Sequence, residues 1–200
     1  AAADRLGITV CNVPGYSARA VAQHTAALLL AVANKTAGFD RLVKSGGWKL
    51  PADPAVTAIP MTELAGKTAG ILGWGAIGRA FGEICLALGM RVLACRRNPD
   101  FSEERENLRF ADLDTLRRES DVLSIHCPLT EETRGMVDRR FLAGMKPGAI
   151  LLNTARGAIL DEEAVAEALD SGRLAGAGVD VFAAEPAGAE NPLARHPKCV

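Results

Sequence analysis

The chain has 200 residues, of which 48% are apolar and 24% charged. A chain of this length buries roughly 70% of its unfolded surface, so the composition excludes a disordered protein and a disulfide-framed mini-protein. The 23 basic residues nearly balance the 24 acidic ones and leave a net charge of −1, which argues against a nucleic acid or a membrane as partner.

The cysteines are odd in number and scattered, and none belongs to a CxxC pair: Cys11, Cys85, Cys95, Cys127 and Cys199. This pattern favours reduced thiols over a disulfide framework or a zinc site. The longest apolar run, Thr25–Ala33, is far shorter than the ~20 residues of a membrane span. With no signal peptide visible at the start, we expect a cytoplasmic protein without a metal.

The first third of the chain predicts few regular elements. We expect a strand at Ile8–Asn12 and a helix from Ala18 to about Asn34 or beyond. The helix has a broad apolar face, which is typical of a buried or interface helix: Val21, Leu28, Leu29 and Val32. Residues 45–66 are rich in Gly and Pro and predict an irregular arm. Helix and arm together predict a homodimer, because they would otherwise expose much apolar surface.

Short apolar runs alternate with helical patterns from Lys67 onward. The expected strands are Thr68–Leu72, Arg91–Cys95, Val122–His126, Ile150–Asn153 and Gly176–Val181. The expected helices are Ala76–Leu88, Asp112–Glu119, Asp138–Ala143 and Asp161–Ser171. This alternation predicts an α/β fold with a doubly wound parallel sheet.

A glycine-rich turn, Gly73-Trp-Gly75-Ala76-Ile77-Gly78, follows the first of these strands and opens a helix. In this context the first glycine permits a tight turn, the second lets the backbone approach a pyrophosphate, and the third lets helix and strand pack closely. The helix N-terminus offers unpaired N–H groups to the anion. The turn therefore predicts a dinucleotide site.

The end of the next strand indicates which dinucleotide is bound. An Asp or Glu there would bind the ribose 2′-hydroxyl of NAD. Instead Arg96 and Arg97 follow the strand, 18 residues after Gly78, and no acid occurs before Asp100. Because two guanidiniums suit a 2′-phosphate, the sequence favours NADP(H), with NAD(H) as the alternative.

Several segments, taken together and in order, resemble the D-isomer-specific 2-hydroxyacid dehydrogenases. Besides the glycine turn they are Asn12-Val-Pro-Gly-Tyr-Ser17, Ala20-Val-Ala-Gln-His-Thr25, His126-Cys-Pro-Leu-Thr130, Asn153-Thr-Ala-Arg-Gly157, Gly178-Val-Asp-Val181 and Glu185-Pro186. Pro60-Met-Thr-Glu-Leu-Ala-Gly-Lys and Asn191-Pro-Leu are most similar to the glycerate dehydrogenase/hydroxypyruvate reductase branch. The resemblance implies a Rossmann-type domain and hydride transfer between a nicotinamide cofactor and a small 2-keto or 2-hydroxy acid.

The resemblance also implies roles for individual residues. Arg156 would bind and polarise the substrate, and Glu185 would pair with a catalytic histidine. Asp180 would bind the nicotinamide carboxamide. The remaining positions would line the cofactor, Thr154 and Ala155 on the nicotinamide side and Pro128 and Thr130 on the adenosine side.

The catalytic histidine itself is expected beyond Val200. Among the histidines present, we expect His196 to lie on the surface and His24 to be packed or at an interface. We expect His126 to have a structural or cofactor-lining role. The substrate domain would be largely absent. Residues 1–17 would form the hinge, 18–66 the interface helix and arm, and 67–200 the dinucleotide-binding core. We therefore expect the 200 residues alone to bind cofactor but to turn over poorly.

Two alternatives stay open at this point. One keeps the family but changes the substrate to a phosphoglycerate, D-lactate, formate or phosphite. The other is a cofactor-sensing binding protein akin to the corepressors of this fold, in which the site residues persist without catalysis.

Overall fold

A single six-stranded sheet forms the centre of the molecule. The computed structural model describes residues 2–13, 15–49, 54–57 and 59–200. All strand pairs are parallel, in the order β3-β2-β1-β4-β5-β6. The strands are β1 (Thr68–Leu72), β2 (Arg91–Cys95), β3 (Leu108–Phe110), β4 (Val122–Ile125), β5 (Ala149–Asn153) and β6 (Leu174–Val179). From β1 the chain adds β2 and β3 on one side and then crosses back to add β4, β5 and β6 on the other side of β1, which confirms the predicted doubly wound sheet.

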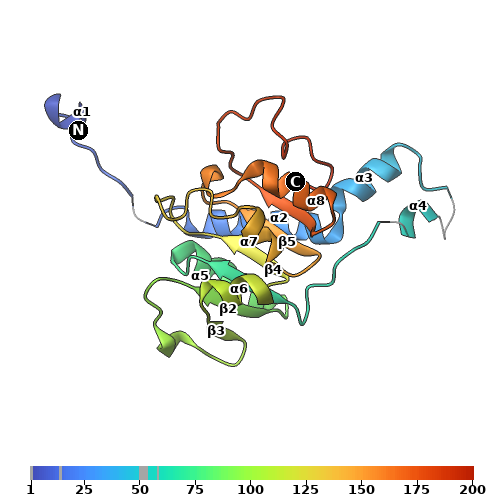
Figure 1. The fold of residues 1–200 in the computed structure, drawn as a ribbon, viewed down its shortest axis with the longest axis horizontal. Helices are drawn as coiled ribbons and strands as arrows, with labels where there is room; N and C mark the ends of the chain where they lie inside the picture. The colour runs from blue at the N-terminus through green and yellow to red at the C-terminus, as the bar shows by residue number, and fades with distance from the viewer. Residues whose placement is uncertain (1, 14, 50–53, 58) are drawn as a thin grey trace.

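Helices cover both faces of this sheet (Figure 1). Two long helices, α2 (Ala18–Asn34) and α5 (Ala76–Ala87), pack on one face, and α6 (Leu113–Glu119), α7 (Arg139–Ala143) and α8 (Glu162–Asp170) pack on the other. Along β5, Ala149 and Leu151 enter one hydrophobic cluster while Ile150 and Leu152 enter the opposite one. Because both faces of β5 are buried, its sequence is a continuous apolar run.

Three helices begin at aspartates, as the sequence predicts. Asp112, Asp138 and Asp161 each accept a hydrogen bond at the side chain from the backbone N–H three residues later, at 2.7, 2.7 and 3.0 Å. Each aspartate is therefore the N-cap, and each helix begins one residue after the predicted start.

The N-terminal region differs from the expectation. Residues 8–13 form no strand, and α1 (Ala2–Arg5) with the segment after it extends away from the sheet (Figure 1). The helix from Ala18 ends at Asn34 because Lys35 adopts a left-handed φ of 52°. A second helix, α3 (Thr36–Lys44), follows directly, and the predicted arm contains α4 (Pro54–Thr57). Residues 50–53 and 58 of the arm lie outside the described residues.

The apolar face of α2 is buried inside this chain. Leu28, Leu29 and Val32 belong to the same hydrophobic cluster as α5 and the sheet. Of the two roles expected for this face, buried or interface, the structure shows burial, so the face of α2 no longer argues for a second subunit; the predicted homodimer stays a prediction. Large apolar side chains are instead exposed in the segments on either side of α2 and α3: Leu6, Ile8, Val10, Val13, Tyr16, Trp48 and Met61.

Two short elements near the site were not predicted. The strand β3 has three residues, too few for a recognisable pattern, and η1 (Phe101–Glu103) is one 3₁₀ turn in the preceding loop. A further 3₁₀ turn, η2 (Gly157–Ile159), follows β5. None of the helices in the described parts of the chain is both long enough and apolar enough to cross a membrane.

Candidate cofactor and catalytic site

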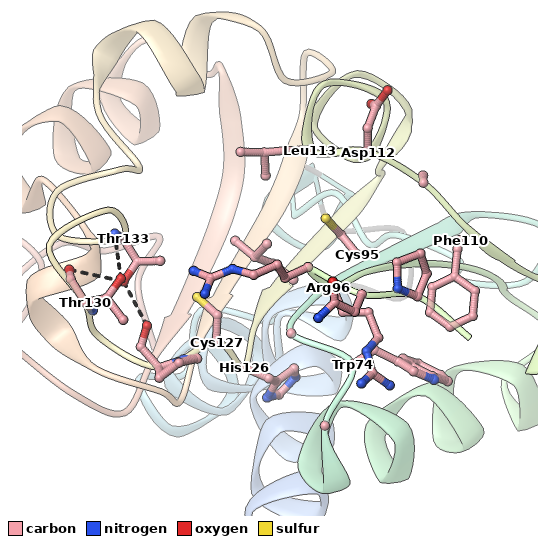
Figure 2. Close-up of a pocket in the computed structure, with 18 of the residues that line it drawn as sticks. Trp74, Cys95, Arg96, Phe110, Asp112, Leu113, His126, Cys127, Thr130 and Thr133 are labelled. Atoms are coloured by element: carbon pink, nitrogen blue, oxygen red, sulfur yellow. Dashed lines mark hydrogen bonds between the residues drawn. The ribbon is translucent and has the colours of Figure 1, made fainter. Parts of the chain in front are cut away.

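A cavity of about 1000 Å³ lies at the carboxyl ends of four strands, β1 to β4. Its lining comes from the segments 72–75, 95–101, 110–113 and 126–133. Figure 2 shows Trp74, Arg96 and Phe110 along one wall and Cys127, Thr130 and Thr133 along the other. This is the edge of the sheet, beside the switch point between β1 and β4, where ligands of doubly wound folds bind.

The glycine turn at the floor of the cavity has the geometry that a diphosphate needs. Gly73 has a φ of +107°, and a side chain there would meet the His126 carbonyl carbon at 2.5 Å. A Cβ on Gly78 would come within 2.2 Å of the Gly73 carbonyl oxygen, which keeps α5 tight against the turn. A Cβ on Gly75, in contrast, would meet no atom within 4 Å. The open space lies where a ligand would approach, so the turn fits a dinucleotide.

Arg96 and Arg97 both line the cavity just after β2. The Arg97 guanidinium lies 2.7 Å from the Glu132 carboxylate, with both side chains mostly exposed, and such a pair is weak. The nearest Arg96 nitrogen is 4.0 Å from Glu103 Oε1. Both guanidiniums can therefore turn toward an anion without leaving a buried carboxylate unpaired.

Glu103 joins the glycine turn to the loop after β2. Its Oε2 accepts hydrogen bonds from the Trp74 indole and from Arg79 Nε, both at 2.9 Å, and Arg79 makes a second contact with Oε1. The hydrogen bond from Trp74, together with Arg79, lowers the pKa of Glu103 below its ordinary value. Trp74 is itself buried against Phe110 in an edge-to-face contact, so aromatic packing adds to the hydrogen bonds at this corner of the cavity.

The opposite wall is held by its own short hydrogen bonds. Thr133 Oγ1 donates to the Pro128 carbonyl at 2.8 Å and accepts from the Thr130 N–H at 2.8 Å (Figure 2). Next to this loop, burial lowers the pKa of His126 to about 4 and raises that of Cys127 to about 11. His126 is therefore neutral at pH 7 and lines the cavity, one of the two roles expected for it.

Arg156 follows β5 in a turn organised by Asn153. The fully buried Asn153 donates from Nδ2 to the Arg156 carbonyl at 3.0 Å and accepts from the Ala155 N–H at 3.1 Å. A Cβ on Gly157 would lie 1.9 Å from the Phe182 carbonyl carbon, so the turn packs directly on the segment after β6. These contacts fix the backbone of Arg156, while its side chain is exposed.

Asp180 lies at the end of β6, and its N–H donates to the Asn153 carbonyl at 3.0 Å. Glu185, five residues further, accepts from the Phe182 N–H at 3.1 Å. Thr154 is buried and bonds to Thr25 of α2 at 2.9 Å between hydroxyls. The structure thus brings Thr154, Asp180 and the Arg156 turn to one end of the sheet, and none of them lines the cavity at the ends of β1 to β4.

One histidine is not where the sequence placed it: the His196 side chain, expected on the surface, is only 7% exposed and bonds to Asp170. For His24, the structure excludes the packed alternative, since its side chain is 49% exposed and its Nε2 lies 3.1 Å from Asp180 Oδ1. The interface alternative for His24 stays a prediction. Sequence reasoning also missed Trp74, Phe110 and Glu103, because their roles depend on contacts between separate segments. Within the described residues, no group of three His, Cys, Asp or Glu side chains could hold a metal ion.

Comparison with known proteins places these features in a family. A sequence model of the "D-isomer specific 2-hydroxyacid dehydrogenase, NAD binding domain" matches residues 26–200. The chain is 41% identical over 198 residues to a hydroxypyruvate reductase of Blautia hydrogenotrophica, covering 99% of this chain and 62% of that protein. It is 44% identical over 193 residues to a glyoxylate reductase of Aeropyrum pernix, covering 96% and 58%.

A solved structure agrees with the sequence matches. The TT0316 protein from Thermus thermophilus superposes with a TM-score of 0.88 at 42% identity, over 100% of this chain and 61% of that one. The chain therefore spans about three fifths of the length of these relatives. The chain belongs to the D-isomer-specific 2-hydroxyacid dehydrogenase family of oxidoreductases and contains its Rossmann-type NAD-binding domain.

Proposed function

We propose that this chain is the cofactor domain of an NADPH-dependent reductase that converts hydroxypyruvate or glyoxylate to D-glycerate or glycolate. When bound, the nicotinamide cofactor supplies or accepts the hydride. The residues of this chain bind the cofactor, hold the substrate and orient the reacting groups.

The observation that carries the choice of NADP(H) is the pair Arg96 and Arg97 at the cavity. The nearby acids are already engaged: Asp100 accepts hydrogen bonds from the Ser102 N–H at 3.1 Å and hydroxyl at 2.6 Å, and Glu103 is held by Trp74 and Arg79. Charge-assisted bonds from two guanidiniums suit a 2′-phosphate better than a 2′-hydroxyl.

On the nicotinamide side, Arg156 would bind the substrate carboxylate and polarise its keto oxygen. Asp180 would accept a hydrogen bond from the carboxamide, and Thr154 and Ala155 would line the ring. Glu185 would raise the basicity of an acid–base histidine supplied from outside these 200 residues. The names of the two relatives support hydroxypyruvate and glyoxylate as substrates.

The cofactor assignment is tested by titrating NADPH and NADH into the wild-type protein and into an Arg96→Ser/Arg97→Ser variant. We expect the wild type to bind NADPH more tightly than NADH. In the variant, the affinity for NADPH should fall on the order of 10- to 100-fold, and the affinity for NADH should not change. Arg195→Ser, an exposed arginine paired only loosely with Glu190, is the matched control. Tighter binding of NADH by the wild type would overturn the assignment.

The substrate assignment is tested in the full-length protein with a panel of 2-keto acids. Hydroxypyruvate and glyoxylate should give the highest kcat/KM with NADPH. A higher value for pyruvate or for a phosphorylated keto acid, or turnover of formate or phosphite, would replace the proposed substrate. Cofactor binding without any turnover would support a binding protein instead.

A further inference from the structure

His24 of α2 contacts a residue of the candidate site although 156 positions separate the two in the chain. Its Nε2 lies 3.1 Å from Asp180 Oδ1, and the two side chains are 49% and 47% exposed. A carboxylate only accepts hydrogen bonds, so Nε2 of His24 carries a hydrogen and its N–H donates the hydrogen bond to Asp180 Oδ1. The proposed function assigns His24 no role.

The fold places His24 over Asp180 by a regular register between α2 and β6. A Cβ on Gly176 would lie 2.6 Å from Val32 Cγ1, and a Cβ on Gly178 would lie 2.9 Å from Leu28 Cβ. Helix and strand therefore touch at Val32–Gly176 and Leu28–Gly178, and the next step along this series is His24–Asp180. Four helix residues advance about 6 Å and two strand residues about 6.6 Å, so the register is maintained along the contact.

The backbone around Asp180 is fixed without His24. The Asp180 N–H donates to the Asn153 carbonyl, and the Asn153 side chain holds the Arg156 turn. One position along α2, buried Thr25 bonds to Thr154 of the same turn at 2.9 Å. These contacts do not constrain the half-exposed side chain of Asp180. The hydrogen bond from His24 occupies Oδ1 and leaves Oδ2 for a ligand.

We propose that His24 is a positioning residue that orients the Asp180 carboxylate toward the nicotinamide carboxamide. The inference rests on the proposed function, in which Asp180 binds that group. It assigns to α2, the helix directly after the predicted hinge, a direct link to the nicotinamide end of the site.

The test compares binding of NADPH with binding of 2′,5′-ADP, a fragment that lacks the nicotinamide. Both are titrated calorimetrically into the full-length wild type and into His24→Ala, His24→Gln and His24→Asn. Gln23→Ala, an exposed neighbour on the same helix, serves as control. We expect His24→Ala to raise the Kd for NADPH about tenfold, which is the effect of losing one charge-assisted hydrogen bond. The Kd for 2′,5′-ADP should change less than twofold.

The amide variants separate positioning from proton transfer. A Gln or Asn side chain can donate a hydrogen bond to Asp180 but cannot relay a proton at neutral pH, so the better-fitting amide should restore NADPH affinity and kcat. Restored affinity with kcat still lost would show that His24 acts as an acid–base group and would overturn the proposal. Equal weakening of NADPH and 2′,5′-ADP, or no effect of His24→Ala, would overturn it as well. A wild type that binds neither ligand would instead contradict the proposed function.

Discussion

The two halves of the sheet carry the candidate site in different ways. On the side formed by β1 to β4, backbone geometry and a cavity of about 1000 Å³ are formed by residues 72–133, within one continuous stretch of chain. On the side formed by β5 and β6, Arg156 follows β5 while Asp180 and Glu185 follow β6; all three keep exposed side chains, and buried Asn153 bonds to the backbones of Arg156 and Asp180. Under the proposed function, we expect cofactor affinity to reside mainly in the first half and the chemistry to depend on side chains of the second half.

The sharpest test of this division removes Arg156. In the full-length protein we expect Arg156→Leu to lower kcat/KM on the order of 10³-fold, because the charge that we propose to stabilise the transition state is lost. The Kd for NADPH should stay within about twofold, since Arg156 lies outside the cavity at the ends of β1 to β4. Arg118→Leu, an exposed arginine of α6, is the control. A matching loss of cofactor affinity would break the division between the halves.

The glycine turn offers a second test on the other half. Gly75→Ala should leave the free energy of unfolding nearly unchanged, because the added Cβ meets no protein atom within 4 Å. It should nevertheless lower the affinity for the dinucleotide on the order of 100-fold, because the added methyl group would occupy the space proposed for the diphosphate. Affinity and denaturation are measured on the same preparation.

Gly78→Ala is the matched contrast to Gly75→Ala. Its Cβ would lie 2.2 Å from the Gly73 carbonyl oxygen, so we expect about 1–3 kcal/mol of destabilisation as well as lost binding. Gly188→Ala, with open space around it, controls for glycine replacement in general. Unchanged affinity in Gly75→Ala would show that no ligand approaches the turn.

The buried histidine of the first half predicts a pH dependence of stability. Burial holds the pKa of His126 near 4, against 6.5 in the unfolded chain, so between these values the unfolded state binds more protons. Stability should therefore be independent of this group above about pH 6.5 and fall as the pH drops toward 4, by about 2 kcal/mol at pH 5. Urea denaturation at pH 7.5 and pH 5 measures this. A His126→Asn variant should lose that part of the slope, and an unchanged slope would argue against the burial effect.

The smallest expected effect concerns Glu103, whose carboxylate lies 4.0 Å from Arg96. Glu103→Gln keeps an acceptor for Trp74 but removes a negative charge beside the proposed 2′-phosphate site. NADPH should bind about threefold more tightly at low salt, with NADH unchanged, and the gain should shrink as salt is added. Glu190→Gln, on an exposed loop, is the control. If the affinity for NADH rises as well, the substitution acts through the loop and not through the charge of the 2′-phosphate.

Much of the core was predictable because local chemistry and tertiary structure agree there. Strands β1 and β2 begin and end at the predicted residues, and the capping aspartates mark three helix starts within one residue. The predicted strand at Ile8–Asn12 failed because an apolar run forms a strand only where a neighbouring strand pairs with it. The glycine turn and the arginines after β2 were named from their spacing after predicted strands, whereas Arg156, Asp180 and Glu185 were named from the resemblance to the family, and their roles stay predictions.

The sequence by itself determined the doubly wound sheet, the glycine turn and the arginines after β2, since each follows from local spacing and residue type. Only the tertiary structure decided that Glu103 ties the cavity corner to Trp74 and Arg79, and that His24 reaches Asp180. Both contacts join segments that are distant in the chain. The His24–Asp180 contact arises from the close approach of α2 and β6 at Gly176 and Gly178, and the Glu103 contacts arise where the loop after β2 lies against the glycine turn and α5; no local pattern encodes either distance.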